Sequence, residues 1–260
     1  MSKNKLSKFA DMEQYERVLQ YPFARLQAEG FPFRGSWATE LFGNTKPIVL
    51  ELGCGKGEYT VGLARRFPDK NFIGIDIKGA RMWSGARQVN EEHIKNAAFL
   101  RTDIGLLSEF FASEEVSEIW VTFPDPQMKK AGKRLTGTRF LKLYSEICCP
   151  GALLHLKTDS PFLYTYTKAL IEANGLELLH DTSDLYGGSF ANIDRDVLGI
   201  RTYYEQQWLD RGLCIKYIAF QIPQGKILTE PDIDIKPDSY RSFNRSRRSL
   251  EAMEKNKEIN

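Results

Sequence analysis

Leu50-Glu51-Leu52-Gly53-Cys54-Gly55-Lys56-Gly57 is the stretch of sequence that decides the fold of this chain. The apolar residues before Glu51 predict a buried strand, and a helix is predicted over residues 59–67, after the glycines. Three glycines at alternate positions allow a tight turn and a close approach of ligand to backbone. A second buried strand, residues 71–75, ends at Asp76, whose carboxylate can accept both hydroxyl hydrogens of a ribose. Together these features predict a nucleotide-binding α/β sheet.

The spacing of the glycines also indicates which nucleotide cofactor is bound. In a dinucleotide-binding loop the glycines are separated by one and then two residues, and a pyrophosphate sits on the helix N-terminus. Here Gly53, Gly55 and Gly57 are spaced two by two, and Glu51 precedes them. A carboxylate at that place would repel a pyrophosphate, but it suits the ammonium or sulfonium group of S-adenosylmethionine. We therefore expect S-adenosylmethionine as the cofactor.

Composition sets the general class of protein. A chain of 260 residues with 42% hydrophobic content can bury a full core as one domain with appendages. Apolar runs all fall well short of the ~20 residues that span a bilayer, and the N-terminus lacks the apolar stretch of a signal peptide. The four cysteines have no metal-ligand spacing, so no metal site is expected. A cytoplasmic enzyme that does not act at a membrane is the prediction.

Strands and helices are predicted to alternate from residue 46 to residue 222, which indicates one doubly wound domain. We expect a mostly parallel sheet of seven strands with helices on both faces. The strands are predicted over residues 48–50, 71–75, 97–101, 118–122, 152–156, 176–181 and 215–221. Residues 1–45 are predicted to be an N-terminal extension that docks on this domain, with a short helix over residues 11–20. Residues 223–260 are predicted to be a flexible basic tail, containing Arg241, Arg245, Arg247 and Arg248.

Acidic residues follow five successive predicted strands. They are Glu51, Asp76, Asp103, Asp125 and Asp159. Right-handed crossovers bring the ends of these strands to one edge of the sheet, where ligands bind in such folds. The sequence therefore predicts that the five acids line one cleft.

Phe123-Pro124-Asp125-Pro126 is the second distinctive motif. Two prolines stiffen the backbone on either side of Asp125, so the loop presents one carboxylate. It follows the fourth strand, where the transferred methyl group lies in S-adenosylmethionine enzymes of this sheet type. A carboxylate there can accept the paired ring and amino hydrogens of guanine. A helix-capping aspartate at a strand exit is the alternative interpretation.

A basic segment without acidic residues follows Asp125. It contains Lys129, Lys130, Lys133, Arg134, Arg139 and Lys142. Such a segment is commonly a solvated helix face, and composition alone leaves that interpretation open. Its place beside the expected reaction centre favours phosphate binding, because phosphate contacts dominate nucleic-acid affinity.

The order of these motifs resembles that of the bacterial tRNA (guanine-N7-)-methyltransferases, a family with the Rossmann-like fold of class I methyltransferases. The resemblance covers residues 47–220 and rests on Glu-Leu-Gly-Cys-Gly-Lys-Gly, Gly-Ile-Asp, Thr-Asp-Ile, Phe-Pro-Asp-Pro, Lys-Thr-Asp and Thr-Tyr-Tyr-Glu. It implies transfer of a methyl group from S-adenosylmethionine to guanine N7 at position 46, in the variable loop of tRNA. One departure is that Gln127 and Met128 replace the tryptophan usual after Pro-Asp-Pro.

The resemblance also implies roles for individual residues. Asp125 matches the active-site residue and, with Glu51, Asp76 and Asp103, the acids that contact the cofactor. The positions that match tRNA-substrate contacts are Lys129, Asp159, Thr202, Tyr203, Tyr204 and Glu205, together with Lys133 and Arg134 in the RNA-interacting loop.

Guanine N7 carries a lone pair and no proton, so its methylation needs no general base. We therefore assign Asp125 an orienting and electrostatic role. Two other functions stay open on sequence grounds: a methyltransferase for another RNA, a small molecule or a protein side chain, and a non-catalytic RNA-binding module. Binding of S-adenosylmethionine would exclude the last. The sequence leaves open whether the protein is a monomer or a homodimer.

Overall fold

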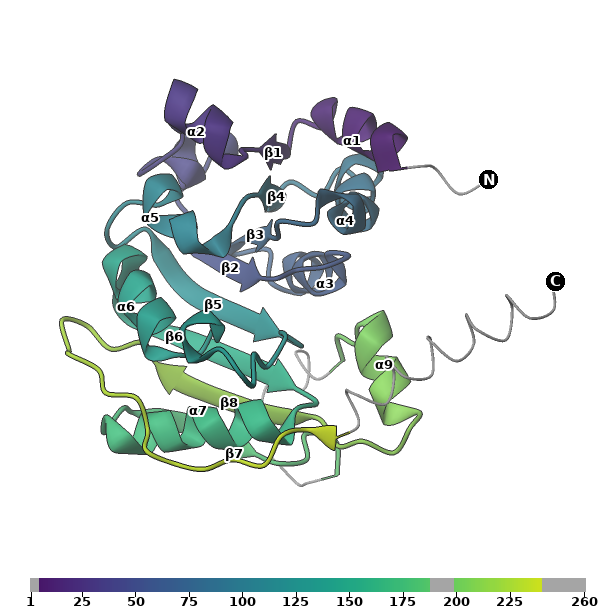
Figure 1. Cartoon of the computed structure of the whole chain (residues 1–260). Helices are drawn as coiled ribbons and strands as arrows, with labels where there is room; N and C mark the ends of the chain where they lie inside the picture. The colour runs from purple at the N-terminus through teal and green to yellow at the C-terminus, as the bar shows by residue number, and fades with distance from the viewer. Residues whose placement is uncertain (1–4, 188–198, 240–260) are drawn as a thin grey trace, which may run out of the picture.

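The computed structural model describes residues 5–187 and 199–239 of the chain (Figure 1). In chain order its elements are α1 (Lys5–Glu13), β1 (Val18–Gln20), α2 (Phe23–Glu29), η1 (Trp37–Leu41), β2 (Ile48–Leu52), α3 (Glu58–Arg66), β3 (Asn71–Ile75), α4 (Gly79–Glu91), β4 (Ala97–Arg101), η2 (Ile104–Leu106), α5 (Leu107–Phe110), β5 (Val116–Thr122), η3 (Ala131–Lys133), α6 (Thr138–Ile147), β6 (Cys148–Thr158), α7 (Pro161–Ala173), β7 (Leu178–Thr182), α9 (Tyr203–Leu209) and β8 (Lys216–Gln221).

The strands form one sheet in the order β1-β4-β3-β2-β5-β6-β8-β7. All neighbours from β1 to β6 are parallel, because helical crossovers connect them, whereas β8 runs antiparallel between β6 and β7. Helices cover both faces of this sheet (Figure 1). The predicted α/β class and mostly parallel sheet are confirmed. The predicted count of seven strands is wrong, since the described residues form eight.

The additional strand, β1, lies within residues 11–20, for which the sequence predicts a helix. The helix predicted over residues 11–20 ends at Glu13, and Val18–Gln20 instead forms β1. Val18 pairs in parallel with Phe99 of β4, the strand that would otherwise leave its backbone groups unpaired at the edge of the sheet. A strand of three residues is too short to show an alternating pattern, so its distant partner decides its conformation. The N-terminal segment thus contributes to the sheet itself.

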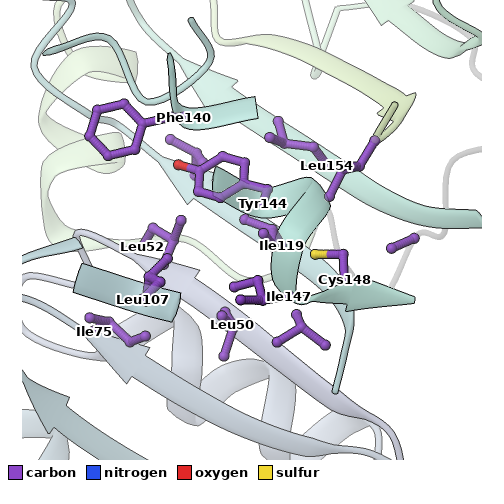
Figure 2. Close-up of a cluster of buried hydrophobic side chains, with 14 of the residues drawn as sticks. Leu50, Leu52, Ile75, Leu107, Ile119, Phe140, Tyr144, Ile147, Cys148 and Leu154 are labelled. Carbon is purple, nitrogen blue, oxygen red and sulfur yellow. The ribbon is translucent and has the colours of Figure 1, made fainter. Parts of the chain in front are cut away.

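Alternate side chains of the strands fill two hydrophobic cores, one on each face of the sheet. Leu50 and Leu52 point toward α5 and α6, where Figure 2 shows them with Tyr144 and Ile147. Val49 lies in the opposite core, under α3 and α4. β2 is buried on both faces, which explains why its first three residues, 48–50, are all apolar and do not alternate with polar ones. The rigid sheet fixes the position of every turn at its edge.

Candidate functional site

A cavity of about 690 Å³ opens at the carboxyl ends of the parallel strands. The strand order reverses there, between β2 and β5, which is where open α/β sheets bind ligands. Glu51, Asp76, Asp125 and Asp159 all line this cavity. Asp103 lines an adjoining cavity of about 420 Å³, and Asp76 belongs to the walls of both. The prediction that five acids line one cleft is thus correct for four, because the turn after β4 places Asp103 in the neighbouring hollow.

The three glycines of the loop are needed for two different reasons, open space beside the backbone and close packing of helix on sheet. Gly53, Gly55 and Gly57 have φ angles of 77°, 55° and 74°, in the left-handed region that disfavours other residues. A Cβ atom at Gly53 would have no described atom within 4 Å, and one at Gly55 would be 3.9 Å from its nearest neighbour. A Cβ atom at Gly57 would instead lie 2.5 Å from the Phe99 ring. The first two glycines therefore keep space in the cavity open, whereas the third allows helix and sheet to pack closely.

Glu51 is a buried carboxylate whose two oxygen atoms are both held. Its side chain is 3% exposed. Oε1 accepts a hydrogen bond of 2.7 Å from the Thr122 hydroxyl, and Oε2 accepts one of 2.8 Å from the Thr60 amide and another from the Thr60 hydroxyl. Burial raises the pKa of Glu51 to about 7, against the opposing effect of these hydrogen bonds. A cationic ligand beside it would favour the ionised form.

Asp76 and Asp103 each accept hydrogen bonds from backbone amides near the end of the strand that they follow. Asp76 accepts hydrogen bonds from the amides of Gly55, at 3.0 Å, and Lys78, at 2.7 Å, so it joins the ends of β2 and β3. Asp103 accepts one of 2.7 Å from the Gly105 amide and caps η2. Each carboxylate oxygen has two lone pairs, so these bonds leave acceptor capacity for a ribose hydroxyl.

Asp125 lies on a strained loop at the end of β5. Phe123 and Gln127, on either side of the Pro-Asp-Pro element, have φ angles of 50° and 47°. Such conformations cost ~1–3 kcal/mol each for residues other than glycine and cluster at functional sites. The Asp125 side chain is exposed toward the cavity and accepts a hydrogen bond of 3.0 Å from the Gln127 amide. The loop thus holds this carboxylate at the rim.

The basic residues after Asp125 divide into exposed and buried positions. Lys129 and Lys133 are exposed, and Lys133 lines both cavities. Arg134 is buried, with its guanidinium 4.2 Å from the centre of the Tyr166 ring. It donates hydrogen bonds of 3.3 and 3.1 Å to the carbonyl oxygens of residues 127 and 128. Arg134 therefore shapes the loop that carries Asp125, and its contact with a substrate stays a prediction.

The residues predicted from the last motif gather at the start of α9. Thr202 and Glu205 form a capping box, with the Glu205 amide 3.1 Å from the Thr202 hydroxyl. Thr202 and Tyr204 line the cavity near Asp159, which is buried. Tyr203 is half exposed and lies outside the lining, with its ring centre 4.0 Å from Lys56 Nζ. Glu205 is fully buried and forms an ion pair with Lys157 inside the protein. Its contact with a substrate stays a prediction.

Several residues that hold these groups were not found from the sequence. Thr60 and Thr122 hold Glu51, and Glu58 accepts a hydrogen bond of 3.1 Å from the Tyr203 amide. Lys157 forms an ion pair with the buried Glu205. Lys157 directly follows the apolar strand predicted over residues 152–156, and that place is a usable signal, because a lysine buried with the end of the strand requires a partner. The roles of Thr60 and Thr122 depend on their distances from Glu51 in the folded protein, which no sequence pattern gives.

The described residues contain no group of three or more histidine, cysteine, aspartate or glutamate side chains placed to hold a metal ion. In residues 5–187 and 199–239, no helix combines the length and apolarity that crossing a membrane requires.

Comparison with known proteins gives matches along most of the chain. The family model described as "Putative methyltransferase" matches residues 45–217. The tRNA (guanine-N(7)-)-methyltransferase of Porphyromonas gingivalis W83 is 65% identical over 241 residues, which is 92% of this chain and 98% of that protein. The protein of the same name from Bacteroides thetaiotaomicron is 58% identical over 249 residues, covering 96% and 98% of the two chains.

A solved structure supports the fold independently. The 16S rRNA methyltransferase KamB superposes with a TM-score of 0.54 and 16% sequence identity, over 72% of this chain and 93% of that one. At such low identity the likeness shows the fold alone, which is that of class I methyltransferases.

Proposed function

Since the chain belongs to the tRNA (guanine-N7-)-methyltransferase family, we propose that it methylates N7 of the guanine at position 46, in the variable loop of tRNA. S-adenosylmethionine is the cofactor of this reaction and supplies an electrophilic methyl group. One observation carries the proposal: the exposed Asp125 carboxylate and the open glycine loop share one cavity. Cofactor and base can therefore meet at one place.

The residues that line the cavity suit this cofactor. Gly53 and Gly55 leave open space above the backbone, and a carboxylate at Asp76 can accept both ribose hydroxyl hydrogens. Glu51, which is buried below the loop, suits a ligand with positive charge. Asp103 lies in the adjoining hollow, where it would contact the part of the cofactor beyond the ribose.

Asp125 would hold the guanine. Its carboxylate can accept the ring and amino hydrogens on the edge of guanine opposite N7, which directs N7 into the cavity. Because N7 has no proton to lose, the enzyme needs alignment and not a general base. Alignment of two reacting groups can supply ~7–11 kcal/mol. The methylated base is cationic, so Asp125 also stabilises the charge that develops during transfer.

The surface around the cavity would bind the tRNA. Lys129 and Lys133 are exposed beside Asp125 and carry charges that suit phosphate groups. Tyr204 lines the cavity on the α9 side, and Tyr203 is exposed beside it outside the lining; both offer aromatic rings on which unpaired bases would stack. An enzyme with this substrate would act in the cytoplasm.

The proposal is tested by mapping the methyl group. Unmodified tRNA transcripts with guanine at position 46 are incubated with the protein and labelled S-adenosylmethionine. The label should appear as 7-methylguanine at that position, as determined by nuclease digestion and mass spectrometry. A matched transcript with adenine at position 46 is the control and should stay unlabelled. Methylation of the control, or of another position in the first transcript, would contradict the proposed target.

A further inference from the structure

The segment from residue 223 to residue 239, here called the strap, leaves β8 and crosses back over α6 and α7 (yellow-green in Figure 1). Asn174, at the end of α7, exchanges two hydrogen bonds of 2.8 Å with the backbone of Thr229. Glu230 accepts a hydrogen bond of 2.7 Å from the hydroxyl of Tyr166, which lies nearer the start of α7. The strap therefore follows α7 from its last turn toward its first.

Asp238 holds the end of the strap at the start of α7. Its side chain is 7% exposed. Residues 240–260, with the four arginines of the predicted tail, lie outside the described part of the chain. One carboxylate oxygen of Asp238 accepts a hydrogen bond of 2.9 Å from the Phe162 amide, and the other accepts one from the Ser160 hydroxyl. The Asp238 amide donates a hydrogen bond of 3.2 Å to the sulfur of Met128. Asp238 thus joins the start of α7 to the loop that follows β5.

These two segments carry two of the acids of the candidate site. Asp159 directly precedes Ser160, and Asp125 lies three residues before Met128. Both acids line the cavity. Asp238 is therefore connected to both of them through their neighbours in the chain.

Arg134 makes a second connection between the strap and the loop after β5. It donates hydrogen bonds of 3.3 and 3.1 Å to the carbonyl oxygens of residues 127 and 128. Its guanidinium lies 4.2 Å from the centre of the Tyr166 ring, and the hydroxyl of that ring donates to Glu230 of the strap. The loop is therefore held by Asp238 at one point and by Arg134 at two others.

The backbone of this loop requires contacts with other segments. Phe123 and Gln127 have positive φ angles, and such conformations persist only where the surrounding structure fixes them. The Phe123 amide donates a hydrogen bond of 2.8 Å to the Lys157 carbonyl, which fixes the start of the loop on β6. The hydrogen bond from the Gln127 amide to Asp125 spans two residues, so it shapes the loop without fixing it to the sheet. After Asp125, α7 and the strap supply contacts that do.

We propose that Asp238 is a positioning residue for methyl transfer, which holds the loop of Asp125 relative to Asp159 so that the bound guanine is aligned with the methyl group. The inference rests on the proposed function, because it takes guanine in the cavity as the substrate. The match to the family model ends at residue 217, before the strap begins. Misplacing a reacting group by ~1 Å can lower the rate by ~10²-fold, so a residue outside the cavity can control turnover.

The first test compares the two ends of the strap. Asp238 and Asn174 are each 7% exposed and each holds the strap on α7, but Asn174 lies at the other end of that helix. Asp238→Ala should lower kcat about tenfold at saturating S-adenosylmethionine and tRNA, with KM for tRNA changed by less than about threefold. Asn174→Ala is the matched control, which should lower the melting temperature but keep kcat near wild type. Equal losses of kcat in the two variants, or wild-type kcat in Asp238→Ala, would overturn the proposal.

A double variant tests whether Asp238 acts through Asp125. Asp125→Asn removes the carboxylate that Asp238 would position, so adding Asp238→Ala should lower kcat further by less than about threefold. Independent residues would instead give their separate losses in full. A further loss of about tenfold in the double variant would show that Asp238 acts through another group, and the proposal would be wrong.

Hydrogen exchange follows the loop in the absence of tRNA and cofactor. The backbone amides of residues 127–134 should exchange about tenfold faster in Asp238→Ala than in wild type, because the loop opens more often. The same amides should exchange at the wild-type rate in Asn174→Ala. Asp238→Asn keeps one oxygen that accepts a hydrogen bond, so it should recover part of kcat and of the protection, and it replaces Asp238→Ala if that variant does not fold. Wild-type exchange in the folded Asp238 variants would refute the proposal.

The two proposals fail in distinguishable ways. A wild-type protein that does not methylate tRNA refutes the proposed function, whereas hydrogen exchange still measures how the strap holds the loop. A wild-type protein that methylates position 46, together with Asp238→Ala no more impaired than Asn174→Ala, refutes the positioning role alone. Thermal unfolding of each variant checks that the protein is folded at the temperature of the assay.

Discussion

Lys157 and Glu205 form an ion pair of 2.9 Å in which neither side chain is exposed. Glu205 also accepts a hydrogen bond from the Tyr186 hydroxyl, and Lys157 donates one of 3.4 Å to the Ile200 carbonyl. Burial lowers the pKa of Lys157, while the nearby Glu205 carboxylate opposes this shift. Because Lys157 is on β6 and Glu205 on α9, the pair fixes the position of α9 relative to the sheet.

Substituting one partner of this pair should be more harmful than replacing both. Lys157→Met leaves the Glu205 charge buried without its partner and should lower the free energy of unfolding by ~3–5 kcal/mol. The double variant Lys157→Met/Glu205→Leu removes both charges and should recover a large part of that loss. Urea denaturation of wild type, Lys157→Met and the double variant measures the three free energies of unfolding. A double variant less stable than Lys157→Met would show that the pair is not the source of the effect.

Cofactor binding should release a proton near neutral pH. Glu51 has a pKa of about 7 because it is buried, and a cation bound nearby would lower that pKa. Affinity for S-adenosylmethionine should therefore rise as the pH increases from 6 to 8. Calorimetry in buffers of different ionisation enthalpy would count the released protons. Glu51→Gln should abolish the proton release, and its persistence in that variant would point to another group.

The same residue should affect the stability of the cofactor-free protein. Folded Glu51 keeps its proton up to a pH of about 7, whereas the unfolded chain loses it near its ordinary pKa of 4.5. The folded state therefore binds more protons in this window, so the contribution of Glu51 to the free energy of unfolding falls as pH rises, by ~3 kcal/mol in all. The stability difference between wild type and Glu51→Gln should change with pH accordingly. A difference that is constant from pH 4 to pH 8 would contradict the prediction.

Two glycines of the same loop should respond differently to alanine. Both Gly53→Ala and Gly57→Ala incur the cost of positive φ, ~1–2 kcal/mol. Gly57→Ala should be less stable by a further ~1–3 kcal/mol, because its methyl group meets the Phe99 ring. Gly53→Ala places its methyl group in open cavity space and should mainly weaken cofactor binding. Thermal unfolding of both variants measures the stability losses, and titration with S-adenosylmethionine measures cofactor binding. Equal stability losses would contradict the close packing of Gly57 against the Phe99 ring.

Asp125→Asn should reduce turnover without unfolding the protein. The substitution keeps the size of the side chain but replaces one acceptor oxygen with a donor amide that would face the guanine hydrogens. Removing one such transition-state interaction lowers kcat by ~10²–10³. Rates are measured with saturating S-adenosylmethionine, so that weaker cofactor binding does not contribute. Wild-type turnover under those conditions would exclude the orienting role, and Asp159 would become the next candidate.

The central sheet could be predicted because its signals are local. β3 and β4 have the predicted bounds, since each is a short apolar run between polar turns. β1 could not be predicted, because three residues become a strand only through pairing with β4. The carboxyl-edge location of Glu51, Asp76, Asp125 and Asp159 followed from topology, which places the ends of parallel strands together.

The surroundings of each site residue could not be predicted in the same way. Arg134 and Glu205 belong to motifs that suggest exposed contacts, yet both side chains are buried against residues distant in sequence. Their neighbours come from α7 and β6, and packing distances between such elements are absent from a single sequence. The pKa of Glu51 likewise depends on burial and on hydrogen bonds from Thr60 and Thr122, which only the fold brings together.

The pairing of β1 with β4 also has a consequence for biosynthesis. Val18 leaves the ribosome 81 residues before its partner Phe99. At ~5–20 residues per second, β1 waits ~4–16 s before the strand that it pairs with has been synthesised. The edge of the sheet is therefore closed by a strand that is synthesised before β2, β3 and β4 and that stays unpaired with β4 until β4 has been made. Translation speed across those strands sets how long the N-terminal segment is open to proteases and chaperones.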